Sequence, residues 1–361
     1  MRAGLLTTIV LAVTTGAVGA QRSSAPVPAP AGITAVPGIR VGQYTMPGRP
    51  TGCTVVMVDG AGAVGGVSQR GGAPGTRETD LLRSENMVDK VNAVALSGGS
   101  AYGLDVATGV MKYLDEHKTG WNVGAAGVVP IVPTAILFDL GFGGDPAIRP
   151  TADCGYRAAS TATAGPVSEG NFGAGSGATV GKMGGGRAMK GGIGTASITL
   201  PNGLIVGAIA AVNAAGDIID SETNRVIAGA RASDGKTLAD VRKLIRSGAL
   251  DRAASPRPAE NTTIVVVATN AKMTKAEINR VAIMADDGFA RAIVPSHTVG
   301  DGDTVFTLAT GNWSGDANPT IVGALAADAV TETIVRAVSK ATSLGGIPAA
   351  RDLGTVPARI K

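Results

Sequence analysis

The feature that most constrains this 361-residue chain is a boundary between a polar loop and an apolar strand. Residues 255–260 read Ser-Pro-Arg-Pro-Ala-Glu, and after Asn261-Thr262-Thr263 the chain continues with four apolar β-branched residues, 264–267. A run of this kind is typical of a β-strand. We therefore expect the hydroxyl of Thr262 to lie at the start of a strand, directly after a loop.

A hydroxyl in this place predicts chemistry as well as structure. If the chain cuts itself between Asn261 and Thr262, Thr262 gains a free α-amine beside its hydroxyl. The amine, whose ordinary pKa is about 8, can act as the base for that hydroxyl near neutral pH. Two plainer interpretations stay open, because a Thr-Thr pair is a common strand start and Asn261-Thr262-Thr263 also matches the N-x-Ser/Thr glycosylation pattern.

The first twenty residues have the pattern of a secretory signal peptide. Arg2 supplies a positive start, residues 5–18 are mostly apolar, and small residues precede a cut at Gln21. The apolar run is too short for a membrane span. The sequence predicts a signal peptide over 1–20, a flexible lead-in over 21–37 and a single domain over 38–361, in a secreted or periplasmic protein without a membrane partner.

Charge and histidine content argue against several classes of function. The net charge is only +4, and no basic cluster is interleaved with aromatic residues, so we expect no nucleic-acid partner. The two histidines and the carboxylates form no cluster at ligand spacing, so we expect no metal or cofactor. His117 lies in a polar helix end. A Ser-His-Asp triad would have to use His297, and no G-x-S-x-G motif accompanies it.

The chain has two cysteines, Cys53 and Cys154. They can form a disulfide in an oxidising compartment. Their apolar or mixed surroundings in the sequence fit a pair of buried free thiols equally well. Two cysteines alone cannot hold a zinc ion, so the sequence leaves the disulfide and the thiol states open.

Hydrophobic periodicity predicts strands mixed with helices. The expected strands are 54–58, 128–140 (edge or bulged because of its prolines), 192–200, 204–212, 264–268 and 304–309. The expected helices are 99–116, 238–245, 274–285 and 319–343. Asn202-Gly203 predicts a hairpin turn, and Thr274 and Glu277 have the spacing of a capping box. Helices outside strands that are mostly hairpin-linked favour a layered α+β architecture.

Five segments together resemble one family, the N-terminal-nucleophile aminopeptidases typified by L-aminopeptidase/D-Ala-esterase. This family includes β-peptidyl aminopeptidases and the endo-type nylon-oligomer (6-aminohexanoate) hydrolases. The segments are RGGAPGTRETD (70–80), LSGGSAYGL (96–104), GAGSGATVGK (173–182), NTTIVVVATN (261–270) and DGDT (301–304). Each is weak alone, but their order along nearly the whole predicted domain is specific.

The resemblance implies an α+β fold, the four-layer αββα sandwich of N-terminal-nucleophile hydrolases. It also implies a precursor that cuts itself before Thr262 into a large chain, 21–261, and a small chain, 262–361. The two chains would stay together as a heterodimer and assemble into a homo-oligomer, often a tetramer. The implied activity is hydrolysis of short peptides or peptide-like amides through an acyl-enzyme on Thr262.

The resemblance also implies roles for four other side chains. Asn213 lies at the end of an expected strand, and its amide would donate to the oxyanion. Lys182 would balance charge near Thr262 and lower the pKa of its amine or hydroxyl. Asp301 and Asp303 flank a glycine at a strand entry and would point to one face, one orienting Thr262 and the other pairing with Lys182. Outside the family context, these residues fit a loop amide, a solvated lysine and a turn.

Two departures from the family concern the substrate site. Phe138 stands where some relatives have a tyrosine, so a hydroxyl is missing there. An aminopeptidase also needs a carboxylate for the substrate amine, and Glu78, Asp139 and Asp145 are all candidates.

Three alternative functions stay open beside peptide and amide hydrolysis. They are endo-hydrolysis of linear oligoamides such as 6-aminohexanoate oligomers, acyl transfer of the ornithine acetyltransferase type, and a non-catalytic exported scaffold.

Overall fold

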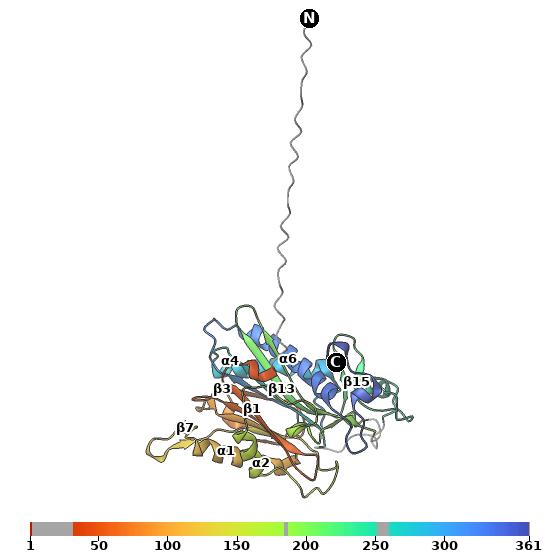
Figure 1. Ribbon diagram of the computed structural model, residues 1–361, viewed down its shortest axis with the longest axis horizontal. Coiled ribbons are helices and arrows are strands. Elements are labelled where there is room, and N and C mark those ends of the chain that lie inside the picture. The colour runs from red at the N-terminus through yellow and green to blue at the C-terminus, as the bar shows by residue number, and fades with distance from the viewer. Residues whose placement is uncertain (2–31, 184–186, 251–259, 361) are drawn as a thin grey trace.

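Two large β-sheets face each other, and helices cover both outer faces (Figure 1). The structure is a computed structural model that describes Met1 and residues 32–183, 187–250 and 260–360. Helices α1 and α2 pack on the first sheet, and α4 and α6 pack on the second. The order of layers is therefore helix, sheet, sheet, helix, which is the αββα arrangement that the resemblance implies.

The two sheets differ in size and in the strands that they combine. The first sheet has the order β1 (Ile39–Thr45), β2 (Gly52–Val58), β6 (Ala93–Ser97), β9 (Thr134–Ile136) and β4 (Thr76–Arg77). The second has the order β12 (Gly192–Thr199), β13 (Ile205–Asn213), β16 (Thr262–Thr269), β18 (Thr304–Ala309), β3 (Ala63–Gln69) and β5 (Lys90–Val91). β16 pairs antiparallel with β13 and parallel with β18, so it lies in the middle of its sheet.

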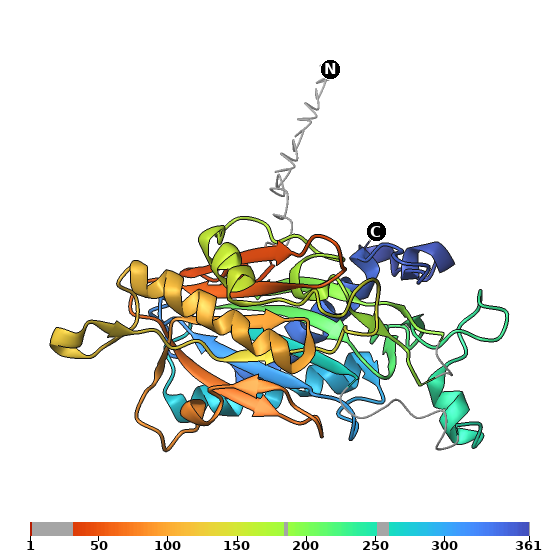
Figure 2. The same cartoon turned by 90° about the horizontal axis from the view of Figure 1, so that it is seen from below.

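The remaining elements cover the sheets or project from them. The helices are α1 (Val106–Glu116), α2 (Ala152–Ser160), α3 (Val241–Arg246), α4 (Lys275–Ala285), α5 (Asp287–Ala292) and α6 (Pro319–Lys340). Small sheets join β10 (Thr179–Val180) to β11 (Met189–Lys190), β7 (Trp121–Asn122) to β8 (Val128–Val129), and β14 (Asp217–Ile219) to β15 (Val226–Ala228) and β17 (Ile293–Val294). The β7–β8 hairpin extends away from the layered body (Figure 2).

The apolar run of β16 is explained by its position between two covered faces. Ile264 and Val266 belong to the cluster between the two sheets. Val265 and Val267 belong to the cluster between the second sheet and helices α4 and α6. All four side chains are at most 1% exposed. Burying each one contributes about 1.5–3 kcal/mol, so a polar substitution on either face would destabilise the fold.

Local sequence signals confirm most of the expected elements. The capping box that opens α4 is present, with the Thr274 hydroxyl accepting from the Glu277 N–H and the Glu277 carboxylate accepting from the Thr274 N–H. The hairpin of β12 and β13 has the expected turn at Asn202 and Gly203, where Gly203 has a positive φ of 87°. Asn318 caps α6 by accepting from the N–H of Thr320.

Two expected elements are wrong in extent. The expected strand over 128–140 contains only the short strands β8 and β9, because Pro130 and Pro133 have no N–H to donate to a neighbour. The expected helix over 99–116 begins as a 3₁₀-helix, Ser100–Asp105, and becomes α-helical only from Val106.

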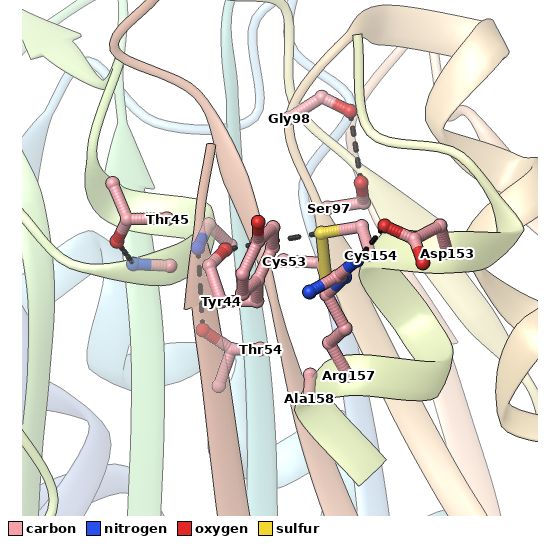
Figure 3. The surroundings of a disulfide bond; sticks show 12 residues. Tyr44, Thr45, Cys53, Thr54, Ser97, Gly98, Asp153, Cys154, Arg157 and Ala158 are labelled. Atoms are coloured by element: carbon pink, nitrogen blue, oxygen red, sulfur yellow. Dashed lines mark hydrogen bonds and ion pairs between the residues drawn. A yellow bond between two sulfur atoms is a disulfide. The ribbon is translucent and has the colours of Figure 1, made fainter. Parts of the chain in front are cut away.

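The two cysteines form a disulfide between the first sheet and its covering helix. Cys53 lies on β2 and Cys154 on α2, next to Tyr44 and Arg157 (Figure 3). Both cysteines are at most 1% exposed. The bond therefore ties the outer helical layer to the sheet from inside the core, and it decides between the two states that the sequence left open.

The predicted signal peptide, 1–20, and most of the lead-in, 21–37, fall on residues 2–31, which lie outside the described residues. Export therefore stays a prediction. Within the described part of the chain, no helix combines the length and the apolar character that crossing a bilayer requires.

Removing the disulfide tests its contribution to stability. The bond closes a loop with a sequence separation of 101, for which lost loop entropy corresponds to about 4–5 kcal/mol. We expect the free energy of unfolding of the Cys53→Ala/Cys154→Ala variant to be lower by this amount. Its urea midpoint should therefore be lower than that of the wild type. A reductant should bring the wild-type midpoint to that of the variant without changing the variant. Equal midpoints for the two oxidised proteins would contradict the account.

Candidate active site

Thr262 is the first residue of β16, and its neighbours in the sheet place polar groups on both sides of it. On one side, Thr262 is paired with Asn213, the last residue of β13. On the other side, a parallel bridge joins Asn261 to Asp301, just before β18. Thr262 is only 3% exposed. The sheet register thus brings two of the predicted site residues to the Asn261–Thr262 bond.

The carbonyl of Asn261 receives two hydrogen bonds. The backbone N–H of Gly302 donates to it at 2.9 Å, and the hydroxyl of Thr262 donates to the same oxygen. A Cβ at Gly302 would lie 2.8 Å from the Thr262 Oγ and 2.9 Å from the Ala73 carbonyl oxygen, so only glycine allows this approach. The hydroxyl, the carbonyl and a backbone donor therefore meet at the expected cleavage point.

The side chain of Asn261 is buried without a hydrogen-bond partner among the described residues. Asn261 is 0% exposed, and neither its Oδ1 nor its Nδ2 has a partner there. A buried polar group left in this state costs about 1–3 kcal/mol. The buried side chain of the residue before Thr262 therefore lowers the folding stability of the uncut chain.

The amide of Asn213 is held in one orientation by its neighbours. Its Oδ1 accepts from the Thr179 N–H at 3.0 Å and from the Lys182 Nζ at 2.9 Å. Its Nδ2 therefore donates, to the Phe138 carbonyl at 3.0 Å and to the Glu260 carbonyl at 3.3 Å. Asn213 thus directs its donor end toward the segment that precedes Thr262, as an oxyanion donor would.

Lys182 lies beside Asn213, and no carboxylate of the described residues lies within ion-pair distance of its Nζ. Its Nζ donates to the Asn213 carbonyl at 2.9 Å and to the Glu260 carbonyl at 3.1 Å. Burial of the ammonium lowers the pKa of Lys182 to about 7, helped by the charge of Lys190 and opposed by Asp301 and Glu260. The expected pairing with an aspartate is wrong as far as the described residues extend, because carbonyl and amide oxygens occupy the ammonium.

Asp301 and Asp303 flank Gly302 but serve different partners. Asp303 accepts from the Thr263 N–H at 2.7 Å through Oδ1 and from the backbone N–H of His297 at 3.0 Å through Oδ2. Asp301 accepts from the Thr298 N–H at 2.8 Å, and its Oδ1 is buried with no partner in the described parts of the chain. The expected common strand face is wrong, because β18 begins only at residue 304.

Burial also alters the acidity of Asp301. Asp301 is only 2% exposed, and this burial raises the pKa of its carboxyl. The charge of Asp303 raises the pKa further. A carboxyl with a raised pKa can exchange protons closer to neutral pH than an ordinary aspartate. The site therefore holds two groups, Lys182 and Asp301, whose pKa values are both shifted toward neutral pH.

His297 is the residue whose place the sequence missed. Its Nδ1 lies 3.0 Å from the Asp303 Oδ2, so it contacts the carboxylate that binds the Thr263 N–H. Sequence reasoning considered it only as the base of a serine triad. It lies six residues before Asp303 in a non-repetitive segment, and no periodicity connects the two. His117, by contrast, is exposed, as expected.

Asp139, a candidate for binding a substrate amine, is already engaged. Its Oδ1 lies 2.7 Å from an Arg49 guanidinium nitrogen and accepts from the Gly99 N–H at 2.9 Å, and its Oδ2 accepts from the Thr51 hydroxyl at 2.6 Å. Both charged side chains are 0% exposed. Asp139 is therefore a structural ion-pair partner, and releasing it would leave a buried arginine unpaired.

The other two candidates bind local backbone groups. Glu78 accepts from the Val132 N–H at 3.2 Å, and Asp145 accepts from the Ala147 N–H at 2.8 Å. Within the described part of the chain, neither carboxylate forms a hydrogen bond with Thr262 or Asn213. At the site itself, Asp301 has a carboxylate oxygen without a hydrogen-bond partner among the described residues.

Comparison with known proteins identifies the family. The sequence profile of peptidase family S58 matches residues 31–351. The chain belongs to peptidase family S58. An uncharacterized aminopeptidase of Mycobacterium tuberculosis is 44% identical over 346 residues, covering 89% of this chain and 97% of the relative. The 6-aminohexanoate-oligomer endohydrolase of Paenarthrobacter ureafaciens is 30% identical over 315 residues, covering 83% of this chain and 84% of that enzyme.

Solved structures confirm the fold. A β-aminopeptidase of Burkholderia sp. has a TM-score of 0.65 at 22% identity, covering 92% of this chain and 95% of the other. The L-aminopeptidase D-Ala-esterase/amidase of Ochrobactrum anthropi, described as a variant of the Ntn hydrolase fold, has a TM-score of 0.66 at 19% identity, covering 91% and 95%. The expected α+β sandwich and the expected enzyme class, a hydrolase of peptide or amide bonds, are both confirmed.

The lowered pKa of Lys182 predicts a dependence of stability on pH. The unfolded chain keeps the ordinary pKa of 10.5, so between pH 7 and 10 it binds more protons than the folded chain, and folding becomes more favourable as pH rises. We expect this rise to be smaller in a Lys182→Met variant, by roughly 1.4 kcal/mol per pH unit. Urea unfolding on a Thr262→Ala background measures it, with exposed Lys272→Met as the control.

If the two lysine variants show the same pH dependence as their parent, Lys182 is an ordinary solvated lysine and its assigned environment is wrong.

Proposed function

We propose that this protein is a self-processing amide hydrolase in which cleavage between Asn261 and Thr262 creates the nucleophile. The observation that carries the proposal is the meeting of the Thr262 hydroxyl with the Asn261 carbonyl and the Gly302 N–H. A hydroxyl held against the carbonyl that precedes it is placed for an intramolecular acyl shift.

Self-cleavage proceeds in two steps, an acyl shift to the hydroxyl and hydrolysis of the resulting ester. The Thr262 Oγ attacks the Asn261 carbonyl carbon, and the oxyanion keeps the hydrogen bond from the Gly302 N–H. The C–N bond then breaks, and the hydroxyl proton passes to the departing nitrogen, which leaves an ester on Thr262. Water hydrolyses this ester to a carboxylate on Asn261 and frees the α-amine and hydroxyl of Thr262.

The mature site uses groups that the uncut chain occupies with its own carbonyls. In the uncut chain Asn213 and Lys182 both donate to the Glu260 carbonyl. Departure of the new chain end frees these donors for a substrate. The Thr262 Oγ then attacks the substrate carbonyl while its amine takes the proton, and Asn213 donates to the oxyanion. The amine returns the proton to the leaving nitrogen, and water releases the acyl group from Thr262.

The carboxylates hold this arrangement in place. Asp303 fixes the backbone after the nucleophile through the Thr263 N–H. Asp301, whose Oδ1 has no hydrogen-bond partner among the described residues, accepts from the new α-amine of Thr262. Lys182 balances these negative charges from the Asn213 side. Loss of any one of them should affect both self-cleavage and turnover.

The substrates of this site are short peptides or peptide-like amides, from which the enzyme releases N-terminal residues. The alternative is endo-cleavage of linear oligoamides such as 6-aminohexanoate oligomers, which the name of the Paenarthrobacter relative suggests. Relatives named as aminopeptidases have the higher identity, 44%, and this favours the first substrate class. The Phe138 carbonyl accepts from Asn213, and the phenyl side chain at this position has no hydroxyl to assist binding.

We further infer that the protein is exported through the signal peptide over 1–20 and works as a heterodimer of 21–261 and 262–361. These heterodimers assemble into a homo-oligomer, which the family resemblance implies is a tetramer. The disulfide between Cys53 and Cys154 supports this location, because such bonds persist in oxidising compartments.

Substitution of Thr262 tests self-cleavage. We expect the purified protein to run as two chains under denaturing conditions, with the smaller starting at Thr262 by mass spectrometry. Thr262→Ala should stay one chain without amidase activity, while Thr262→Ser keeps a hydroxyl and should be cut. Thr263→Val is the control, since the Thr263 hydroxyl has no hydrogen-bond partner among the described residues. An active wild type that stays in one piece would disprove the proposed nucleophile.

Substrates with a blocked amino group distinguish exo-aminopeptidase activity from endo-hydrolysis. An exo-aminopeptidase needs a free substrate amine, so N-acetylation should lower kcat/KM on a short peptide by about 10²-fold or more. Equal cleavage of free and blocked oligoamides, followed by mass spectrometry of the products, would instead support endo-hydrolysis. An added amine acceptor that diverts the acyl group would support acyl transfer, and a wild type inert toward all of these compounds would support the scaffold alternative.

A further inference from the structure

His297 is attached to Asp303 by two contacts. Its backbone N–H donates to the Asp303 Oδ2 at 3.0 Å, and its ring Nδ1 lies 3.0 Å from the same oxygen. The other carboxylate oxygen accepts from the Thr263 N–H at 2.7 Å. One carboxylate therefore connects the imidazole to the backbone directly after Thr262.

The backbone and a neighbouring aromatic ring fix the imidazole in this place. His297 has a positive φ of 55°, a left-handed conformation that is uncommon outside glycine and that Asn, Asp and His adopt more often than other residues. Its ring centre lies 5.2 Å from that of Phe289, which is fully buried. The side chain of His297 is 18% exposed and that of Asp303 only 3%. The left-handed backbone and the packing against Phe289 both keep the imidazole beside Asp303.

The charged groups that face the imidazole are Asp303, Asp286 and Arg70. Asp286 is 1% exposed and accepts from the Ser68 hydroxyl, and an Arg70 nitrogen lies 3.3 Å from its Oδ2. Burial works to lower the pKa of His297, but the hydrogen bond and charge of Asp303, with Asp286, outweigh it and raise the pKa above 6.5. The imidazolium is thus the favoured form at mildly acidic pH.

We propose that His297 is a positioning residue for the nucleophile, which holds Asp303 against the Thr263 N–H and so fixes the start of β16. This inference rests on the proposed function of Thr262 and adds a residue that acts through Asp303 and touches neither substrate nor scissile bond. The protonated ring donates a charge-assisted hydrogen bond to the carboxylate, which is stronger than a neutral one. As pH rises and the ring loses its charge, the hold on Asp303 weakens.

The chain has only two histidines, so a matched pair of variants tests this assignment. His297→Asn keeps a side-chain donor and tolerates a positive φ, but it cannot carry a charge. His117→Asn removes the exposed histidine as the control. We expect His297→Asn to lower kcat and the rate of self-cleavage by about 10- to 100-fold near pH 5.5, with KM changed less than kcat.

The pH dependence separates positioning from simple support of the loop. Because the raised pKa of His297 makes its contribution largest below pH 6.5, the ratio of wild-type to His297→Asn kcat should fall as pH rises toward 9. A His297→Asn variant that folds with wild-type rates, or whose defect is the same at every pH, would overturn the proposal. His117→Asn should give the wild-type profile throughout.

A titration that does not depend on activity covers the case in which His297→Asn fails to fold. Imidazole NMR signals of the wild type, assigned by comparison with His117→Asn, should show His297 titrating above 6.5. In Asp303→Asn that pKa should fall. Unchanged titration of His297 in Asp303→Asn would overturn the proposal even if Thr262 proves to be the nucleophile. Conversely, failure of Thr262→Ala to block cleavage would reject the proposed function without altering this titration.

Discussion

Strand β16 lies between β13 and β18, and its hydrogen bonds to both neighbours decide where every candidate catalytic group stands. The antiparallel partner brings Asn213 opposite Thr262, and the parallel partner brings the Gly302 N–H to the Asn261 carbonyl. A shift of one residue in either pairing would turn the strand over and point the hydroxyl to the other face. Because the side chains of β16 are buried on both faces, burial alone does not set this register, and the pairings with β13 and β18 define it.

The same central position explains the electrostatics of the site. A nucleophile at the start of a buried strand is surrounded by groups that are poorly solvated, and charge there is costly. Burial lowers the pKa of Lys182 to about 7 and raises the pKa of Asp301. The buried side-chain amide of Asn261, which has no hydrogen-bond partner within the described ranges, is a further cost in the uncut chain. We infer that cleavage relieves part of this cost and exposes the polar groups to a substrate.

Sequence reasoning was most successful where the signal is local or repeated over nearly the whole chain. The capping box at Thr274, the turn at Gly203 and the apolar run of β16 each follow from a few adjacent residues. The layered fold followed from the element pattern and from the resemblance to the family, and the solved structures confirm it. The site residues Asn213 and Lys182 do lie together, beside the expected cleavage point.

Contacts between distant segments could not be predicted, because no sequence pattern encodes them. Asp139 is bound to Arg49, 90 residues away, and this removes it as a candidate for the substrate amine. The two aspartates around Gly302 diverge, because the strand begins after them and the alternation of a strand does not apply. His297 depends on a left-handed backbone that its sequence context does not reveal.

Trapping the acyl-enzyme tests the central claim most directly. The protein is mixed with an excess of an activated ester or short amide, quenched in acid during turnover, and digested for peptide mapping by mass spectrometry. The account predicts that the acyl mass lies on Thr262 at the start of the small chain, on its hydroxyl oxygen. Acylation of another residue, or steady turnover with acyl groups on an internal, uncut Thr262, would contradict it.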